Sequence, residues 1–299
     1  PFSLIQKLIR KGQIRVGGKR AQMDTRLEAG QEVRIPPSAE AGKVDEYFRP
    51  GKDDTAYIKG MVIYDDGDII ALNKPGGLPS QGGKNIGRHV DGLLAALGEG
   101  DGKPKLCHRL DRDTSGILLV ARSREMAARL GKAFENKNIR KYYYALTMGV
   151  PEMNEGTIDA PLVKGDGAYK DMMVVDADTG KFSRTEFHVV ERAAKRAAFV
   201  AFWPRTGRTH QIRVHAAEGG FPIVGDEKYG DIEASHAAIE ALGLAPRLHL
   251  HAARIVMPHP SGKGVMDIRA PLPPELRRSW AQLGFDPEPD DDPFGHVKL

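Results

Sequence analysis

The spacing of apolar residues predicts helices and strands in an irregular order along the chain. Residues 3–10 place apolar side chains at helical spacing, whereas Ile117–Val120 is the unbroken apolar run of a buried strand. We expect strands at 13–16, 32–35 and 140–149, hairpins at 61–72 and 185–203, and helices at 91–97, 123–134 and 209–219. Because strands and helices do not alternate regularly, the pattern favours an α+β fold with a mixed, mainly antiparallel sheet.

Changes in composition divide the chain into four parts. Residues 37–60 are rich in proline, glycine and charge and have little periodicity, which predicts a linker. Helix and strand signals then continue to Leu283. We therefore expect a small module at 1–36, a linker at 37–60, a large domain at 61–285, and an acidic, disordered tail at 286–299.

The positive charge of the chain is concentrated in its first segment. The formal net charge is +4, but residues 1–36 carry eight basic and three acidic side chains, so the remainder is slightly negative. A basic module indicates a polyanionic partner, and a solvated helix face is the alternative. The basic side chains are Lys7, Arg10, Lys11, Arg15, Lys19, Arg20, Arg26 and Arg34.

Cysteine content and hydropathy indicate a cytoplasmic protein. Cys107 is the single cysteine, which excludes an internal disulfide and a cysteine-rich zinc site. No apolar run approaches the roughly 18 residues that span a bilayer, and the first residues lack the apolar core of a signal peptide. We expect no membrane association.

The stretch Lys105–Arg122 combines a buried strand with a dense cluster of charges directly before it. A carboxylate so close to a buried element must be paired or hydrogen-bonded, and Arg109 and Arg112 are the nearest partners for Asp111. Residues 114–116 can turn the backbone toward that carboxylate. From spacing alone, the alternative is a surface turn whose charges are solvated.

Two patterns suggest a bound cofactor, but each lacks a residue that such a binding site needs. The glycine-rich run at 76–85 lacks the lysine that follows the second glycine of a phosphate-binding loop. His249 and His251 lie two apart on a predicted strand, but no third ligand stands at a motif spacing. We expect no nucleotide, no metal and no other cofactor.

Five segments, in order, resemble the pseudouridine synthases that act on large-subunit ribosomal RNA, the class of synthases A, C and D. The central segment is HRLDRDTSG at 108–116, followed by a strand. The Gly76–Gly77 pair of the first segment is most similar to the synthase C group, although Gln81 replaces the usual histidine. The other segments are LNKPGGLPSQGG at 72–83, Lys141-x-Tyr143-x-Ala145, TGRTHQIRVH at 206–215 and Leu250-His251-Ala252.

This resemblance implies a fold and a set of site residues. The fold is a long mixed sheet with the active cleft across its middle. Asp111 is implied to be catalytic, Arg213 to pair with it, Tyr143 to stack on the target base and Leu250 to pack beneath the uracil. Arg109, two residues before Asp111, can fill the gap that a flipped base leaves, or can be a local ion-pair partner of Asp111.

The first segment resembles an S4 RNA-binding module. The matching residues are KLIRKGQIRVGGKR at 7–20 and TRLEAGQEVRIPP at 25–37. Members of that family usually carry one more helix ahead of this point, so we expect an incomplete module. Its predicted RNA contacts are Lys7, Arg10, Lys11, Arg15, Lys19 and Arg20.

Together these patterns predict an isomerase that converts uridine to pseudouridine in 23S ribosomal RNA. Asp111 can act as a nucleophile or assist loss of a C2′ proton. The alternatives are a non-catalytic RNA-binding factor in ribosome assembly, and a glycosidase that uses Asp111 and Asp113. We expect a monomer whose partner is ribosomal RNA.

Overall fold

The computed structural model describes residues 2–36, 48, 50–83, 86–98, 100–135, 139–289 and 292–296. The chain divides into two compact units, Pro1–Tyr47 and Phe48–Leu299. In the smaller unit, Leu8, Ile14 and Ala21 form a minimal core between a helix and a three-stranded sheet. Its elements are α1 (Phe2–Arg10), β1 (Arg15–Val16), β2 (Lys19–Arg20) and β3 (Val33–Arg34).

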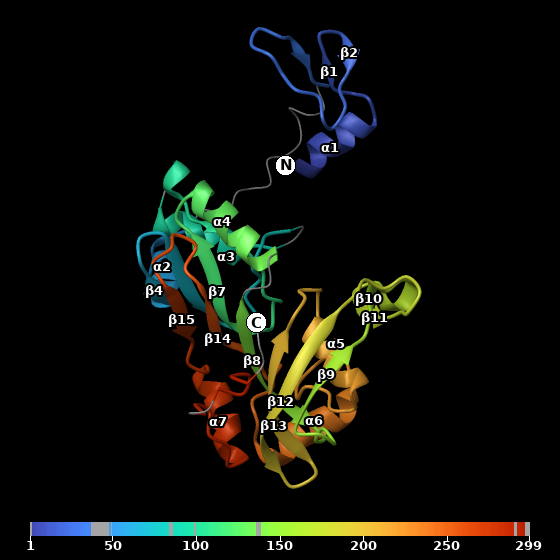
Figure 1. Ribbon diagram of the computed structural model, residues 1–299, viewed down its shortest axis with the longest axis vertical. Helices are drawn as coiled ribbons and strands as arrows, with labels where there is room; N and C mark the ends of the chain where they lie inside the picture. The colour runs from blue at the N-terminus through green and yellow to red at the C-terminus, as the bar shows by residue number, and fades with distance from the viewer. Residues whose placement is uncertain are drawn as a thin grey trace. The chain divides into compact units, whose positions relative to one another are not determined.

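The larger unit is built on one mixed sheet, which confirms the predicted α+β class. Within the described residues ten strands join it, in the order β4-β5-β7-β14-β8-β13-β12-β9, with β15 beside β14 and β6 beside β7 (Figure 1). Among these described strands, the pairing of β7 with β14 is the one parallel pairing. The strands are β4 (Val62–Asp65), β5 (Ile69–Lys74), β6 (Lys105–Leu106), β7 (Ser115–Ala121), β8 (Arg140–Met148), β9 (Glu155–Asp159), β12 (Arg184–Ala193), β13 (Ala197–Pro204), β14 (Leu250–Pro258) and β15 (Val265–Arg269).

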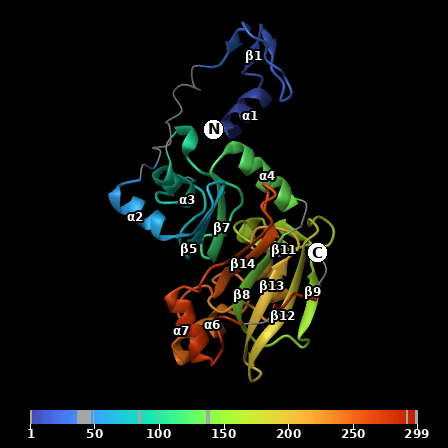
Figure 2. The same cartoon turned by 60° about the vertical axis from the view of Figure 1, so that its left-hand side comes forward.

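Strand β7 is buried on both faces because helices cover both sides of this half of the sheet. Leu118 and Val120 pack toward the helices before β7, whereas Ile117 and Leu119 pack with the helix after it. Figure 2 shows these helices on opposite sides of β5 and β7. They are α2 (Lys52–Gly60), α3 (Val90–Leu93), α4 (Arg124–Glu135) and the 3₁₀ turns η2 (Leu94–Leu97) and η3 (Gly100–Gly102).

In the other half of the sheet, β8 confirms the strand predicted at 140–149, and its side chains alternate between the two faces. Tyr142 and Tyr144 pack with Trp280 of α7 on one face, and Tyr143 faces the opposite side. On that opposite side Ile212 of α5 packs under the sheet. The helices here are α5 (Gln211–Glu218), α6 (Ile232–Leu242) and α7 (Pro274–Gln282).

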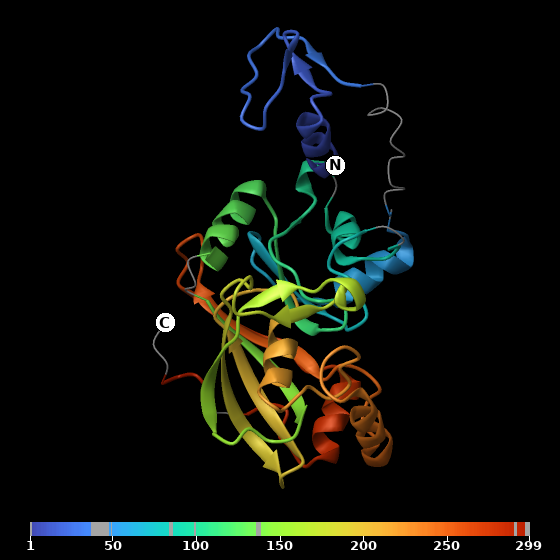
Figure 3. The ribbon, with the colours of Figure 1, turned by 90° about the vertical axis from the view of Figure 1, so that its right-hand side faces the viewer.

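A small hairpin outside the main sheet packs against α5. It consists of β10 (Leu162–Lys164), η4 (Gly167–Tyr169) and β11 (Met173–Val175). Leu162 contacts Val214 of α5 and Tyr229 in a local apolar cluster. Figure 3 shows the yellow-green hairpin next to α5.

Two predicted boundaries are wrong. The predicted linker includes residues 52–60, which form α2, and Ile58 of α2 is fully buried. The predicted disordered tail includes Phe294, which is buried against the Tyr142 ring, and Asp292, which accepts a hydrogen bond of 2.9 Å from the Tyr142 hydroxyl. Residues 52–60 and 292–296 have too few apolar residues to show periodicity, and contact with the sheet orders them. Residues 37–47 and 49 of the predicted linker lie outside the described residues.

Candidate active site

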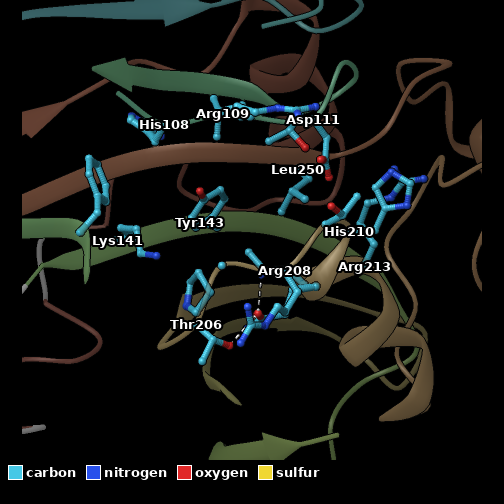
Figure 4. A pocket seen from close by; sticks show the side chains of 18 of the residues that line it. His108, Arg109, Asp111, Lys141, Tyr143, Thr206, Arg208, His210, Arg213 and Leu250 are labelled. Carbon is cyan, nitrogen blue, oxygen red and sulfur yellow. Dashed lines mark hydrogen bonds between the residues drawn. The ribbon is translucent and has the colours of Figure 1, made fainter. Parts of the chain in front are cut away.

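A cleft of about 730 Å³ crosses the middle of the large sheet (Figure 4). Tyr143 of β8 and Leu250 of β14 form its floor, and the loop before β7 carries Arg109 and Asp111 along one side. Arg213 of α5 lies on the other side. The five residues predicted for the catalytic site therefore line a single cavity, although they are up to 141 positions apart in the sequence.

Strand register brings these residues together. His251 of β14 lies opposite Ser115 of β7, and Ala252 lies opposite Tyr143 of β8. The loop that precedes Ser115 must then end beside Leu250. Gly116 permits the close pairing, because its φ is +109° and a Cβ there would lie 2.2 Å from the carbonyl oxygen of Ala252.

Two buried side chains of the first motif, which the sequence did not single out, fasten the Asp111 loop. The Lys74 ammonium donates to the carbonyls of Pro75, Leu78 and Arg112 at 2.9, 2.9 and 3.0 Å. The Ser80 hydroxyl donates to the Leu110 carbonyl at 2.7 Å and accepts from its N–H at 3.1 Å. These contacts fix the backbone on both sides of Asp111.

The expected pairing of Asp111 with its neighbours in sequence is wrong. Arg112 donates to the Gly77 carbonyl at 3.1 Å, and Arg109 is exposed. Among the described residues, none hydrogen-bonds or ion-pairs with the half-buried Asp111 carboxylate, so its oxygens face the cleft. Asp113 is exposed and does not line the cleft, so the pair of carboxylates that a glycosidase would need is not assembled from Asp111 and Asp113.

The expected ion pair between Arg213 and Asp111 is also wrong. Nε and Nη2 of Arg213 donate to the two carboxylate oxygens of Asp226, both at 2.6 Å. Arg213 is 4% exposed and Asp226 is 2% exposed. Although burial lowers the pKa of Arg213, the Asp226 carboxylate raises it above its ordinary value, with a smaller contribution from Asp111. Arg213 thus places a permanent positive charge in the cleft, and Asp226 holds its orientation.

The far end of the cleft holds two side chains whose charged forms are disfavoured. Burial lowers the pKa of Lys141 to about 8. Burial, with a smaller contribution from Lys141, lowers the pKa of His108 to about 3, and its Nε2 accepts the Leu119 N–H at 2.8 Å. Between the two ends, burial and the charge of Asp111 raise the pKa of Tyr143, which keeps its phenol neutral.

The loop that enters α5 is held by Gln211. Its side-chain oxygen accepts from the Thr206 hydroxyl at 2.7 Å and the Arg208 N–H at 3.0 Å, and its side-chain nitrogen donates to Thr185 and to the Arg184 carbonyl. The residue that precedes the helix is His210, in the left-handed conformation with a φ of 52°. The helix predicted at 209–219 therefore begins two residues later, at Gln211.

The two histidines near β14 are used within the fold. His251 contacts the Ser115 hydroxyl at 2.9 Å and the Ala270 carbonyl at 3.1 Å. His249 contacts the Ser279 hydroxyl at 2.9 Å and the Val224 carbonyl at 3.2 Å. Burial lowers the pKa of each ring to about 4, so both are neutral at physiological pH.

The six predicted RNA contacts of the first segment are exposed in the smaller unit, whereas the cleft belongs to the larger unit. In the described part of the chain, no helix is long and apolar enough to cross a membrane.

Comparison with known proteins gives the family of the chain that forms this sheet and cleft. Residues 68–218 match the RNA pseudouridylate synthase family. The chain is 40% identical to ribosomal large subunit pseudouridine synthase C of Salmonella typhi over 93% of its own length and 87% of that protein. The same enzyme of Escherichia coli K12 is 40% identical over 95% of this chain and 88% of that one.

A solved structure gives the same assignment. Human RNA pseudouridylate synthase domain containing 4 superposes with a TM-score of 0.64 at 27% identity, covering 78% of this chain and 97% of that one. The chain belongs to the RNA pseudouridylate synthases and is an enzyme of that class.

Proposed function

We propose that the protein converts uridine to pseudouridine in the 23S RNA of the large ribosomal subunit. In this reaction the N1–C1′ bond breaks, the uracil turns, and a C5–C1′ bond forms. The observation that carries the proposal is the single cleft that holds Asp111, Tyr143 and Arg213. The similarity of nearly the whole chain to enzymes named for large-subunit RNA supports this substrate class.

Asp111 supplies the reacting carboxylate. It can attack C1′ and form a glycosyl ester, as carboxylates do in retaining glycosidases, or it can remove the C2′ proton. Either route sends the electron pair of the N1–C1′ bond to the uracil. The lack of a direct partner for Asp111 among the described residues supports both routes, because its oxygens remain available to the substrate.

Arg213 stabilises the negative charge of Asp111 through space rather than through a shared hydrogen bond. Its guanidinium is oriented by Asp226 and lines the same cleft as Asp111. In a partly water-excluded site, a fixed cation is worth more than the same cation in bulk water. Asp226 is therefore a positioning residue: it orients Arg213, and Arg213 stabilises the Asp111 carboxylate.

Tyr143 and Leu250 form the surface on which the target uracil rests. A uridine in folded RNA must leave its stack, at a cost of a few kcal/mol, and stacking on an aromatic face returns about 1–3 kcal/mol. Arg109 is exposed at the rim of the cleft, where its planar guanidinium can occupy the gap left in the RNA. The exposed basic side chains of the smaller unit add contacts to phosphates.

The role of Asp111 is tested by Asp111→Asn, which keeps size and polarity but removes the charge. We expect this variant to bind RNA with normal affinity and to release no tritium from uridine labelled at C5. Asp113→Asn is the matched control, because Asp113 is two residues away and exposed outside the cleft. Near wild-type release by Asp111→Asn would contradict the mechanism, and RNA binding without turnover by the wild type would favour a non-catalytic binding factor.

A further inference from the structure

His210 combines a strained backbone with a place at the reacting end of the cleft. Its φ is 52°, and in the described residues only Ala194, in a hairpin turn, is another non-glycine residue with positive φ. Such strain at a residue other than glycine persists where surrounding contacts enforce it, and it is concentrated at functional sites. Figure 4 shows His210 near Asp111 and Arg213, away from Lys141 and His108.

Tyr229 determines which ring nitrogen of His210 carries the proton. The Tyr229 oxygen accepts the N–H of Met173 at 2.8 Å, and it lies 2.8 Å from Nδ1 of His210. Among the described residues, the Tyr229 hydroxyl has no acceptor for its own proton other than Nδ1 of His210, so this proton bonds to Nδ1. We therefore assign Nδ1 as an acceptor and Nε2 as the N–H donor.

The surroundings keep this imidazole neutral. Burial lowers the pKa of His210, and the charges of Arg213 on α5 and Lys228 in the following loop lower it further, whereas Asp111 and Asp226 oppose the shift. His210 also precedes the first turn of α5, where the helix dipole disfavours a cation. Among the described residues, none hydrogen-bonds to its Nε2, and its side chain lines the cleft.

A neutral N–H donor beside the reacting carboxylate has a defined use in this reaction. When the N1–C1′ bond breaks, its electron pair moves to N1 and is shared with the uracil carbonyl oxygens. A preorganised donor at such a developing charge accelerates bond cleavage, and a neutral imidazole serves this purpose without giving up its proton.

We propose, on the basis of the proposed function, that His210 is a catalytic residue that donates a hydrogen bond from its Nε2–H to the departing uracil anion. His210 remains neutral throughout. In the nucleophilic route, C5 bonds to C1′ as the ester with Asp111 breaks, so the electron pair returns to the carboxylate. Loss of the C5 proton and gain of a proton at N1 complete the isomerisation. The C2′ route releases the same uracil anion, so the role of His210 is common to both.

Two substitutions separate donation from a purely structural role. His210→Asn suits the left-handed backbone and offers an amide to Tyr229 at the position of Nδ1, but it has no atom at the position of Nε2. His210→Gln extends an amide donor to that position. We expect His210→Asn to lose about 10²- to 10³-fold in single-turnover rate, with unchanged RNA affinity and unfolding temperature, and His210→Gln to regain at least about tenfold.

The leaving group gives a readout that a structural role would not move. Fluorine at C5 stabilises the uracil anion, so RNA with 5-fluorouridine at the target needs the donor less. We expect the loss caused by His210→Asn, measured as consumption of the target nucleoside, to shrink about tenfold or more on this RNA. An equal loss on both RNAs, or equal rates for wild type and His210→Asn on uridine, would overturn the proposed role of His210 and leave the proposed function of the protein intact. No conversion by the wild type would instead overturn the proposed function.

Discussion

At the residue scale, Asp111, the proposed catalytic carboxylate, lies in the same cleft as the cation Arg213 but is not ion-paired with it. The two hydrogen bonds from Arg213 go to Asp226, and both members of that pair are almost fully buried. A buried ion pair is tolerated when geometry and hydrogen bonds compensate for the missing hydration, and the bidentate contact meets that condition. Asp111 receives the field of the cation while its oxygens stay accessible.

We predict that Asp226→Asn lowers the free energy of unfolding by about 3–5 kcal/mol, because it leaves the Arg213 charge buried without its partner. Urea denaturation measures the loss. The matched control is Asp267→Asn, which breaks the bidentate pair of Arg254 with a 42% exposed carboxylate and should cost less than about 1 kcal/mol. Equal losses of unfolding free energy in the two variants would show that burial does not determine how much an ion pair contributes to stability.

Arg109 is predicted to act on base flipping rather than on the chemistry of Asp111. Because Arg109 is exposed and does not pair with Asp111 in the structure, its removal leaves the carboxylate unchanged. Arg109→Ala should therefore reduce turnover much more on a structured RNA than on a short unpaired one, since only the structured RNA must be unstacked. Comparable losses on the two substrates would contradict this role.

At the scale of elements, the site depends on loops that two strands hold at a fixed distance. The first-motif loop follows β5, the Asp111 loop precedes β7, and these strands are neighbours in the sheet. Lys74 spans the two loops with three hydrogen bonds. Burial lowers the pKa of Lys74 to about 7, yet three carbonyl acceptors match the three protons of its ammonium form.

Lys74→Met should lower the free energy of unfolding by about 2–4 kcal/mol and reduce turnover, because it leaves buried carbonyls without a donor and releases the Asp111 loop. Thermal unfolding and tritium release measure the two effects. Lys263→Met is a suitable control, since Lys263 is 53% exposed and has one ion pair, with Asp68. Its effect on the free energy of unfolding should be much smaller than that of Lys74→Met, because an exposed ion pair contributes little. A stable and fully active Lys74→Met variant would show that these bonds are dispensable.

At the scale of the whole molecule, the candidate active site and the exposed basic surface lie in different units. The larger unit holds the complete cleft, and the smaller unit holds exposed basic side chains on a core of three buried residues. Contacts to phosphates add affinity that does not depend on base identity. The smaller unit should consequently strengthen RNA binding without changing the catalytic step.

Replacing the six basic side chains Lys7, Arg10, Lys11, Arg15, Lys19 and Arg20 by glutamine in the full chain should weaken RNA binding. Every phosphate that the protein no longer neutralises reduces the salt slope by about 0.7 for single-stranded RNA, so the slope should fall by up to about 4. Turnover at saturating RNA should be largely kept, because the cleft is unaltered. An unchanged slope would mean that this surface does not contact RNA.

The sequence by itself predicted several of the elements and five of the residues that line the cleft. Strand β7, the alternation of Tyr142, Tyr143 and Tyr144, and the α+β class depend on local periodicity, which each segment carries independently of the rest. The motifs identified Asp111, Tyr143, Arg213, Arg109 and Leu250, and the fold gathers all five around one cleft. Local patterns could not predict α2 or the buried Phe294, because sheet contacts far along the chain order them.

Only the tertiary structure decided which charged groups are partners. Sequence proximity suggested Arg109 and Arg112 for Asp111, and the motif suggested Arg213, but Arg213 is paired with Asp226 and Arg112 bonds to a carbonyl. The hydrogen bond between Tyr229 and His210 could likewise not be predicted from the sequence. Hydrogen bonds depend on the position and direction of individual atoms to within a fraction of an ångström, and packing sets these only after the strands have taken their register.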